Sequence, residues 1–192
     1  MSSPLSAVIA GLSSPDSSVR IAAATRLYHS GRAPADRAVS SWWRNPELSA
    51  LLGPNPIVTV GLAVERETFA RIRAANDAPP LAQVPPDQDA EEFELHFPDG
   101  ISLDVLTTRN PGGPGVIARY LSKFGEGVQQ VEFRCTDVDR ATAILKEEFG
   151  VAPIYPHTRP GADGTRVNFF LVSTPGSGKV LLELYVIPEA QR

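Results

Sequence analysis

The chain has 192 residues, 42% of them hydrophobic and 21% charged, which is the composition of an ordinary globular domain. A formal net charge of −4, without a run of basic residues, argues against binding to nucleic acid or to an anionic membrane surface. The single cysteine, Cys135, excludes an internal disulfide and a multi-cysteine zinc site. It continues an apolar strand pattern, so we expect a buried structural thiol rather than a nucleophile.

The sequence also carries no membrane or export signal. No apolar run approaches the roughly 18 residues that a membrane-spanning helix needs. The first residues, MSSPLSAVIAGLSSPDSS, lack the basic start and the long apolar core of a signal peptide. We therefore expect a cytoplasmic protein with neither membrane nor nucleic acid among its partners.

Residues 1–53 are expected to form an N-terminal helical extension. Apolar residues at helical spacing predict one helix over 14–31, stopped by the glycine at its end, and a second over 34–52. The stretch SSPDSSVRIAAATRLYHSG resembles one HEAT-type repeat unit, and a single unit cannot bury its own apolar face. We therefore expect a HEAT-like hairpin packed on the main domain or on a second subunit, with Trp42 and Trp43 in the core or at that interface.

From residue 57 the pattern changes to the period of two that is typical of β-strands. The first set comprises a strand, a short helix, a proline-rich loop and two further strands. Their expected ranges are 57–64, 67–76, 79–89, 92–97 and 101–106.

The same order then repeats after a helix at 116–124. The expected elements are strands at 128–135, 167–172 and 180–186, a helix capped by Asp139, and a glycine turn at 175–178. The sequence therefore predicts two βαβββ modules, at 57–107 and 128–187.

Paired βαβββ modules are the architecture of the vicinal oxygen chelate superfamily, which includes glyoxalase I and the bleomycin-resistance proteins. The stretches GEGVQQVEFRCTDVDRATAIL and RPGADGTRVNFF, followed by GKVLLEL, most resemble the methylmalonyl-CoA epimerase family. This resemblance covers residues 54–192 and leaves residues 1–53 outside. It implies an α+β, glyoxalase-like fold in which the two modules form a cup-shaped open barrel.

In this superfamily four side chains in the cup hold a metal ion, two of them usually histidines. Carried over position by position, the four fall on Thr59, Asp104, Gln130 and Glu183, so both histidines are replaced. An oxygen-only set favours a weakly held hard cation over nickel, cobalt, zinc or iron. The resemblance therefore implies no cofactor or a weakly bound divalent cation, held if present by Asp104, Gln130 and Glu183 with His96 as a substitute ligand.

Side chains alternate along a strand, which predicts the other residues of the cup. The face of Gln130 also carries Glu132 and Arg134, whereas Gln129 lies on the opposite face and is expected at an edge or towards a loop. Further side chains expected in the cup are Glu92, Leu181 and Phe170. The expected substrate-binding residues are Thr59, Gln130, Arg134, His96, Glu94, Asn168 and Tyr185.

Carboxylates in this cup are the candidates for acid–base chemistry. If Asp104 and Glu183 lie close together, one of them holds a proton near neutral pH unless Arg134 compensates the charge. An acid beside a base is what proton transfer next to a carbonyl group requires. The candidate catalytic residues are therefore Glu183, Asp104 and Glu132.

Three functions fit these observations. The resemblance implies an epimerase, isomerase or lyase that uses enolate chemistry on a small carbonyl or thioester compound. The alternative is a metal-free small-molecule binding protein, as in the bleomycin-resistance branch, and the third is an interaction protein whose N-terminal helices dock a partner. The retained acids favour the enzyme over the interaction protein, while the loss of both histidines favours the binding protein over the enzyme. A small-molecule ligand and a homodimer are the expected partners.

Overall fold

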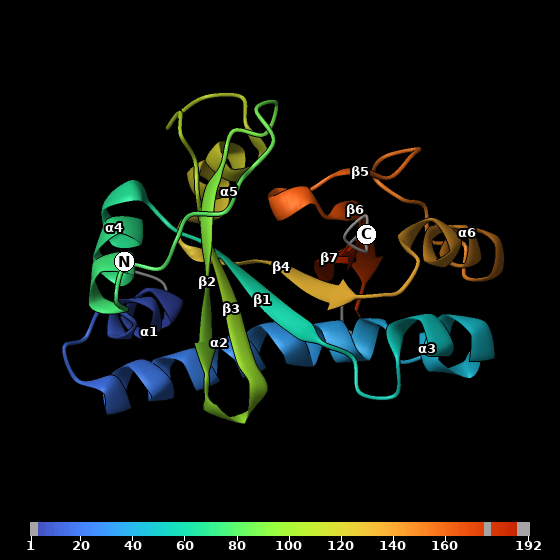
Figure 1. Ribbon diagram of the computed structural model, residues 1–192, viewed down its shortest axis with the longest axis horizontal. Helices are drawn as coiled ribbons and strands as arrows, with labels where there is room; N and C mark the ends of the chain where they lie inside the picture. Colours follow the sequence, from blue (N-terminus) through green and yellow to red (C-terminus); the bar gives the residue numbers. More distant parts are fainter. Residues whose placement is uncertain (1–3, 175–177, 188–192) are drawn as a thin grey trace, which may run out of the picture. The chain divides into compact units, whose positions relative to one another are not determined.

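The computed structural model describes residues 4–174 and 178–187. The chain divides into two compact units, each made of two segments. Figure 1 labels the helices and strands, coloured along the sequence. Unit 1 consists of Met1–Gly31 and Thr59–Gln129, and unit 2 consists of Arg32–Val58 and Gln130–Arg192. The predicted boundary at residue 53, between a helical extension and the main domain, stays a prediction. Within the described ranges, no helix combines the length and the apolar character needed to cross a membrane.

Unit 1 contains a three-stranded sheet in the order β2-β3-β1. Strand β3 runs parallel to β1 and antiparallel to β2. The described stretch 79–89 contains no strand, so the first half is βαββ rather than the predicted βαβββ. The elements of this unit are α1 (Pro4–Gly11), the first part of α2 (Ser17–Ala38), β1 (Val58–Ala63), α4 (Arg66–Ala75), β2 (Glu91–Phe97), η2 (Pro98–Gly100), β3 (Ile101–Thr107) and α5 (Val116–Phe124).

One face of this sheet forms the core of unit 1. Phe93 and Leu95 of β2 are buried, as the alternation of the strand predicts, whereas Glu94 between them is exposed. Phe69 of α4 meets Phe93 edge to face, with ring centroids 4.7 Å apart. Helix α4 therefore covers the apolar face of the sheet.

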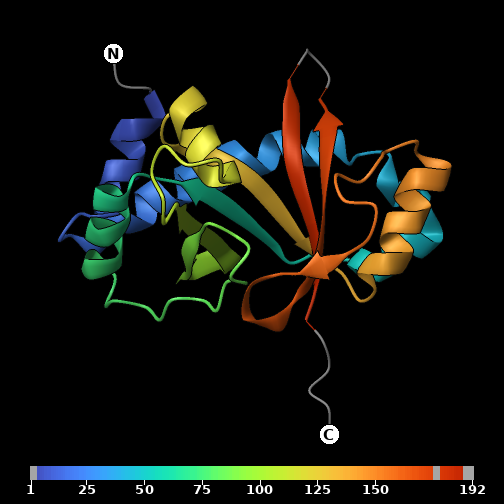
Figure 2. The ribbon, with the colours of Figure 1, turned by 90° about the horizontal axis from the view of Figure 1, so that it is seen from above.

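Unit 2 contains the strand order β4-β7-β6-β5, with β4 parallel to β7 and β6 antiparallel to β7. Strands β6 and β7 form the long hairpin seen in Figure 2. This is the predicted βαβββ order, and residues 175–177 of the predicted turn lie outside the described residues. The elements are the end of α2, η1 (Trp42–Arg44), α3 (Pro46–Leu52), most of β4 (Gly127–Arg134), α6 (Val138–Glu148), β5 (Arg159–Pro160), η3 (Ala162–Gly164), β6 (Arg166–Ser173) and β7 (Lys179–Val186).

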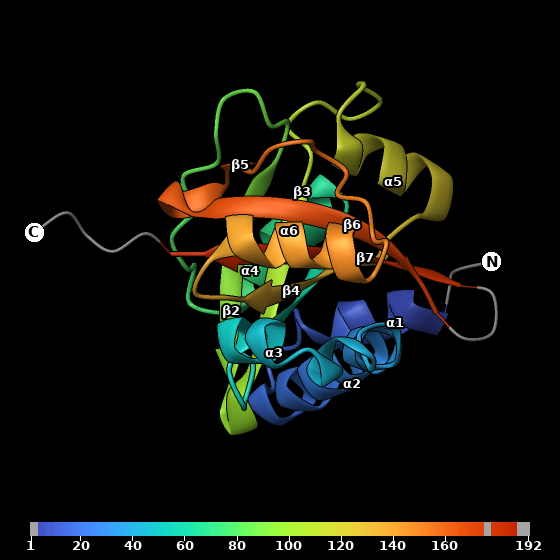
Figure 3. The same ribbon diagram turned by 90° about the vertical axis from the view of Figure 1, so that its right-hand side faces the viewer.

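Helix α6 packs on β6 and β7 (Figure 3). Its buried face carries Ala141, Ile144 and Leu145 at helical spacing. The N-cap is Asp137, whose carboxylate accepts a hydrogen bond from the backbone nitrogen of Arg140 at 2.9 Å, so the prediction that Asp139 caps this helix is wrong.

The N-terminal helices differ from the two that were predicted over 14–31 and 34–52. Residues 4–11 form a separate helix, α1, and the second predicted helix is wrong, because its first residues belong to α2 and the rest of its range holds η1 and α3. Helix α2 runs through Gly31 and Pro34 to Ala38, so the glycine does not end it. A Cβ on Gly31 would lie 2.6 Å from Cγ1 of Val60 and 3.1 Å from Cγ1 of Val128. The glycine is therefore explained by close packing of the helix on two valines, and not by a helix stop.

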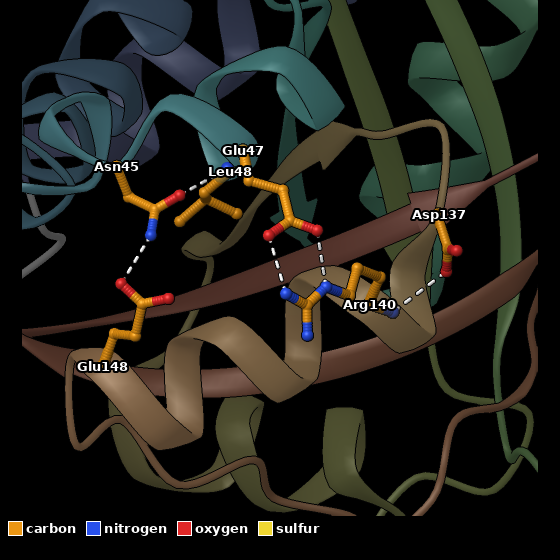
Figure 4. Close-up of polar contacts among 6 residues, drawn as sticks. All are labelled: Asn45, Glu47, Leu48, Asp137, Arg140 and Glu148. Atoms are coloured by element: carbon orange, nitrogen blue, oxygen red, sulfur yellow. Dashed lines mark hydrogen bonds and ion pairs between the residues drawn. The ribbon is translucent and has the colours of Figure 1, made fainter.

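Two side-chain links join α3 to α6 within unit 2 (Figure 4). Arg140 donates two hydrogen bonds of 2.6 Å to the carboxylate of Glu47. Asn45 caps α3 by accepting from the backbone nitrogen of Leu48, and its amide nitrogen donates to Glu148 at 2.6 Å. These contacts fasten residues 45–48 onto α6.

Candidate functional site

Three polar side chains of unit 2 meet on one face of its sheet. Glu132 of β4 stands opposite Glu183 of β7 in the parallel register, and Gln130 lies two residues before Glu132 on the same face. The amide nitrogen of Gln130 lies 3.0 Å from Oε1 of Glu132 and 2.8 Å from Oε2 of Glu183. Gln130 and Glu132 are each only 7% exposed. The sequence therefore predicted correctly that these three residues share a face.

The chemistry of the two neighbours fixes the orientation of the Gln130 amide. An ionised carboxylate only accepts hydrogen bonds, and a protonated one still accepts through its carbonyl oxygen, so the NH2 group of Gln130 suits both neighbours in either state. Each amide hydrogen can then serve one carboxylate. Gln130 thus acts as an uncharged clamp between two acids.

The remaining residues of this face follow from the strand register. Tyr185 stands opposite Arg134, which confirms that both lie on the face of Glu183. The Arg134 side chain is exposed, and it makes no ion pair with either acid in the described part of the chain. The alternative that Arg134 compensates Asp104 and Glu183 joins residues of both units and stays a prediction.

Two residues expected beside Glu183 lie on the other face. Phe169, and not Asn168 or Phe170, stands opposite Glu183, and Asn168 stands opposite Leu184. Asn168 is fully buried, and its amide nitrogen donates to the carbonyl oxygen of Tyr155 at 3.2 Å. Phe169 is thus a residue of this face that the sequence did not predict, as are Val167 and Leu171. The run VNFFLV has apolar residues at both parities, so it gives no alternation from which the face is read.

The matching polar face of unit 1 lies on β2 and β3. Glu94 stands opposite Asp104, and His96 stands opposite Ser102. Asp104 is buried, whereas Glu94 and His96 are exposed. The two nitrogens of the His96 ring lie 3.2 Å from Oε2 of Glu94 and 3.2 Å from Oγ of Ser102. His96 therefore belongs to a local surface pair and contacts no other predicted metal ligand of unit 1.

Thr59 is also buried and lies on the same face of β1 as Gly61, the residue paired with Asp104. The expected convergence of Thr59 and Asp104 with Gln130 and Glu183 joins residues of both units and stays a prediction.

Gln129, the neighbour of the clamp, is not at an edge. It is 8% exposed, and its side-chain oxygen is buried without a hydrogen-bond partner among the described residues. The expectation of an edge or loop-facing position is wrong, because the central residues of β4 are buried on both faces.

Cys135, just after β4, is a buried thiol as predicted. Burial raises its pKa to about 12, since the surrounding protein disfavours the thiolate. Its sulfur lies 3.3 Å from the carbonyl oxygen of Tyr185. At neutral pH the group is a protonated thiol and cannot act as a nucleophile.

The donor set does not fit the transition metal that the superfamily usually holds. In unit 2 the NH2 group of Gln130, which cannot ligate a cation, occupies the space between Glu132 and Glu183. Among the described residues, no group of three or more His, Cys, Asp or Glu side chains is arranged to hold a metal ion.

No protein-family model matches the sequence, and no curated protein matches it either. Solved structures do match. The chain is similar to methylmalonyl-CoA epimerase from Mycobacterium tuberculosis, with 28% identity, a TM-score of 0.56 and coverage of 72% of this chain and 92% of that chain.

Two further structures share the fold. A hypothetical protein from Bacillus halodurans C-125 has 22% identity, a TM-score of 0.55 and coverage of 70% of this chain and 95% of that chain. A Streptomyces coelicolor methylmalonyl-CoA epimerase in complex with 2-nitronate-propionyl-CoA has 23% identity, a TM-score of 0.52 and coverage of 69% and 96%.

Proposed function

We propose that this protein catalyses a proton transfer of the epimerase or isomerase type. The chain has the α+β fold of the vicinal oxygen chelate superfamily. The reacting group is the carbon next to the carbonyl of a small carbonyl or thioester compound. The single observation that carries this proposal is the amide nitrogen of Gln130 held between the carboxylates of Glu132 and Glu183. The similarity to the Mycobacterium tuberculosis methylmalonyl-CoA epimerase supports the reaction type.

In the proposed reaction the two acids have opposite roles. Two carboxylates clamped by one amide group repel each other, so one of them is expected to hold a proton near neutral pH. The ionised acid takes the proton from the α-carbon, which leaves an enolate, and the protonated acid returns a proton to the opposite side of that carbon. The first acid ends protonated and the second ionised, so the reverse reaction restores the pair.

Gln130 has a positioning role in this scheme. It donates to both acids and cannot change its own charge between pH 4 and pH 10, so it fixes their side chains whichever of them carries the proton. Tyr185 and Arg134, which share the face of Glu183, are proposed to contact the substrate.

The test is exchange of the α-proton of methylmalonyl-CoA in D2O, followed by proton NMR. We expect Glu183→Gln and Glu132→Gln each to slow exchange by about 10²-fold or more, since acid–base catalysis contributes roughly 10² to 10⁴-fold. Glu67→Gln is the matched control, because Glu67 pairs with Arg71 on the exposed side of α4. If the wild-type protein exchanges the proton and both variants keep that rate, the proposed pair is wrong.

The second candidate is a metal-free binding protein that uses the same face without catalysis. It is favoured by the amide clamp, which occupies one oxygen of each acid. Saturable binding of methylmalonyl-CoA without proton exchange would select it over the enzyme. Failure of both exchange and binding would remove CoA thioesters from either proposal.

We also propose that the protein forms a homodimer and is located in the cytoplasm. Trp42 is buried in unit 2, so of the two tryptophans only Trp43, which is 36% exposed, remains available to a second copy. Light scattering at micromolar concentration is expected to give the mass of two chains, and the mass of one chain would remove the dimer.

A further inference from the structure

A cavity of about 310 Å³ lies in unit 1, and neither Asp104 nor Glu94 of this unit lines it. Thr107 and Glu91, which are paired in register, line it from the strands. They lie on the face of the sheet opposite that of Asp104. Thr107 is three residues from Asp104 on β3, and side chains an odd number of residues apart on a strand point to opposite faces. The cavity is therefore separate from the polar face of this sheet. Its volume is at the lower end of the range for small-molecule pockets.

Helix α4 forms one wall of the cavity with a single stripe of side chains. The lining residues of the helix recur at intervals of three and four, which places them on one side. Phe69, Ala70 and Ala74 make the middle of the stripe apolar, and Leu81, which is 44% exposed, adds a further apolar side chain. Arg66 and Arg73 add a charge towards each end. The wall is thus a short apolar strip with cationic ends.

The two arginines are not equivalent. Arg66 donates to the carbonyl oxygens of Thr108 and Arg109 and lies 3.8 Å from the carboxylate of Glu91, which compensates its charge. Arg73 donates to the carbonyl oxygen of Pro79 at 2.7 Å, and among the described residues no acidic side chain pairs with it. The uncompensated positive charge of the cavity therefore lies at Arg73.

The segment that closes this end of the cavity is held in an unusual backbone conformation. Asp77 and Ala78 have φ values of 59° and 47°, a region that costs a residue with a side chain about 1 kcal/mol or more. The backbone nitrogen of Ala78 donates to the carbonyl oxygen of Arg73 at 3.0 Å. The chain is thus folded back over the end of α4, which brings Ala78 and Leu81 to the cavity.

A further polar group of the lining lacks a partner. The hydroxyl of Thr107 is buried and makes no hydrogen bond to any described residue. A buried hydroxyl of this kind costs stability unless a ligand or water satisfies it.

We propose that this cavity binds a small monocarboxylate with an aliphatic chain. The carboxylate contacts the guanidinium of Arg73, and the chain lies along Phe69, Ala70, Ala74 and Leu81. A single negative charge matches one uncompensated arginine, and the aliphatic chain covers apolar surface that is otherwise exposed to water. The cavity is then a second small-molecule site, independent of the proposed proton transfer.

The probe is hexanoate, titrated into the full-length protein and followed by backbone amide NMR. We expect saturable shifts at Phe69, Ala70 and Leu81. Hexan-1-ol, which has the same chain length without the charge, is expected to bind at least about tenfold more weakly, because it lacks the charge-assisted hydrogen bond. Shifts that do not saturate, that map elsewhere, or that hexan-1-ol reproduces at equal concentration would overturn the proposal.

Two variants test separately how the charge of Arg73 and the shape of the cavity contribute to hexanoate binding. Arg73→Gln is expected to weaken hexanoate binding at least about tenfold. Ala70→Leu keeps Arg73 and its contacts with residues 78 and 79 but fills the cavity, and it is expected to abolish binding. Arg71→Gln is the control, because Arg71 pairs with Glu67 and does not line the cavity. Unchanged binding in either Arg73→Gln or Ala70→Leu would contradict the assignment.

Discussion

Arg140 of α6 and Glu47 of α3 form a two-point ion pair, with Nε–Oε1 and Nη2–Oε2 distances of 2.6 Å each (Figure 4). Hydrogen bonding to the guanidinium lowers the pKa of Glu47 from its usual 4.5, and the same contact raises the pKa of Arg140. Both side chains are half exposed, so salt screens the pair.

The lowered pKa of Glu47 predicts a pH-dependent contribution to stability. The ionised carboxylate is favoured in the folded state, so its contribution is fully present above pH 4.5 and is lost as the pH falls through the lower folded pKa. Urea unfolding of the wild type and of Glu47→Gln should therefore differ at pH 7 and converge in strong acid. A double-mutant cycle with Arg140→Gln isolates the pair, and a difference that does not change with pH would contradict the assignment.

Replacement of Gly31 by alanine should destabilise the protein although it lies in a helix. Alanine gains about 0.5–1 kcal/mol in helix propensity, but the new Cβ meets the short, branched side chain of Val60 at 2.6 Å. Overpacking of this kind costs about 1–3 kcal/mol, so we expect a net loss of about 1–2 kcal/mol in the free energy of unfolding. Ser30→Ala, at the exposed neighbouring position of α2, should change it by less than about 0.5 kcal/mol.

The two adjacent glutamines should respond to methionine in opposite directions. Gln129→Met removes a buried oxygen without a partner and keeps the volume, so we expect a gain of about 1 kcal/mol in the free energy of unfolding. Gln130→Met leaves Glu132 and Glu183 without their shared donor, and we expect a loss of about 1–3 kcal/mol. In urea unfolding, a gain for Gln130→Met would show that its amide has no structural role, and a loss for Gln129→Met would show that its buried oxygen does not destabilise the fold.

The donor set predicts that the purified protein holds no stoichiometric transition metal. Elemental analysis should find far less than one equivalent of nickel, cobalt, zinc or iron per chain, because Thr59 and Gln130 stand where imidazoles are expected. The double variant Thr59→His/Gln130→His should then gain affinity for these metals. A full equivalent in the wild type would contradict the ligand assignment, and no gain in the double variant would show that the four positions do not converge.

The alternation of polar and apolar residues predicted which side chains of the strands are buried, because a sheet with one apolar face buries every second residue of each strand. In β2, the run EFELHF assigned Phe93 and Leu95 to the core and left Glu94 outside. In β4, alternation placed Glu132 on the face of Gln130, the family resemblance placed Gln130 beside Glu183, and the register agrees with both.

The wrong predictions have two causes. Some residue types occur for more than one structural reason, and some strands show no alternation of polar and apolar residues. Gly31 looks like a helix stop, but the close approach of Val60, which no local pattern encodes, explains it better. Asn168 was assigned to the wrong face because apolar residues stand on both sides of β6. The cavity beside Arg73 was not predicted, because it depends on two consecutive residues in the left-handed region, Asp77 and Ala78, and alanine rarely adopts that conformation.

The buried thiol of Cys135 makes local opening of the protein measurable without any mutation. Reagents such as iodoacetamide attack thiolates, and a side chain with a pKa of about 12 offers almost none while the chain around it stays closed. Each modification event must therefore wait for the segment after β4 to open, and one cysteine per chain yields one signal without ambiguity. The alkylation rate of the wild-type protein then measures how often this part of unit 2 unfolds locally.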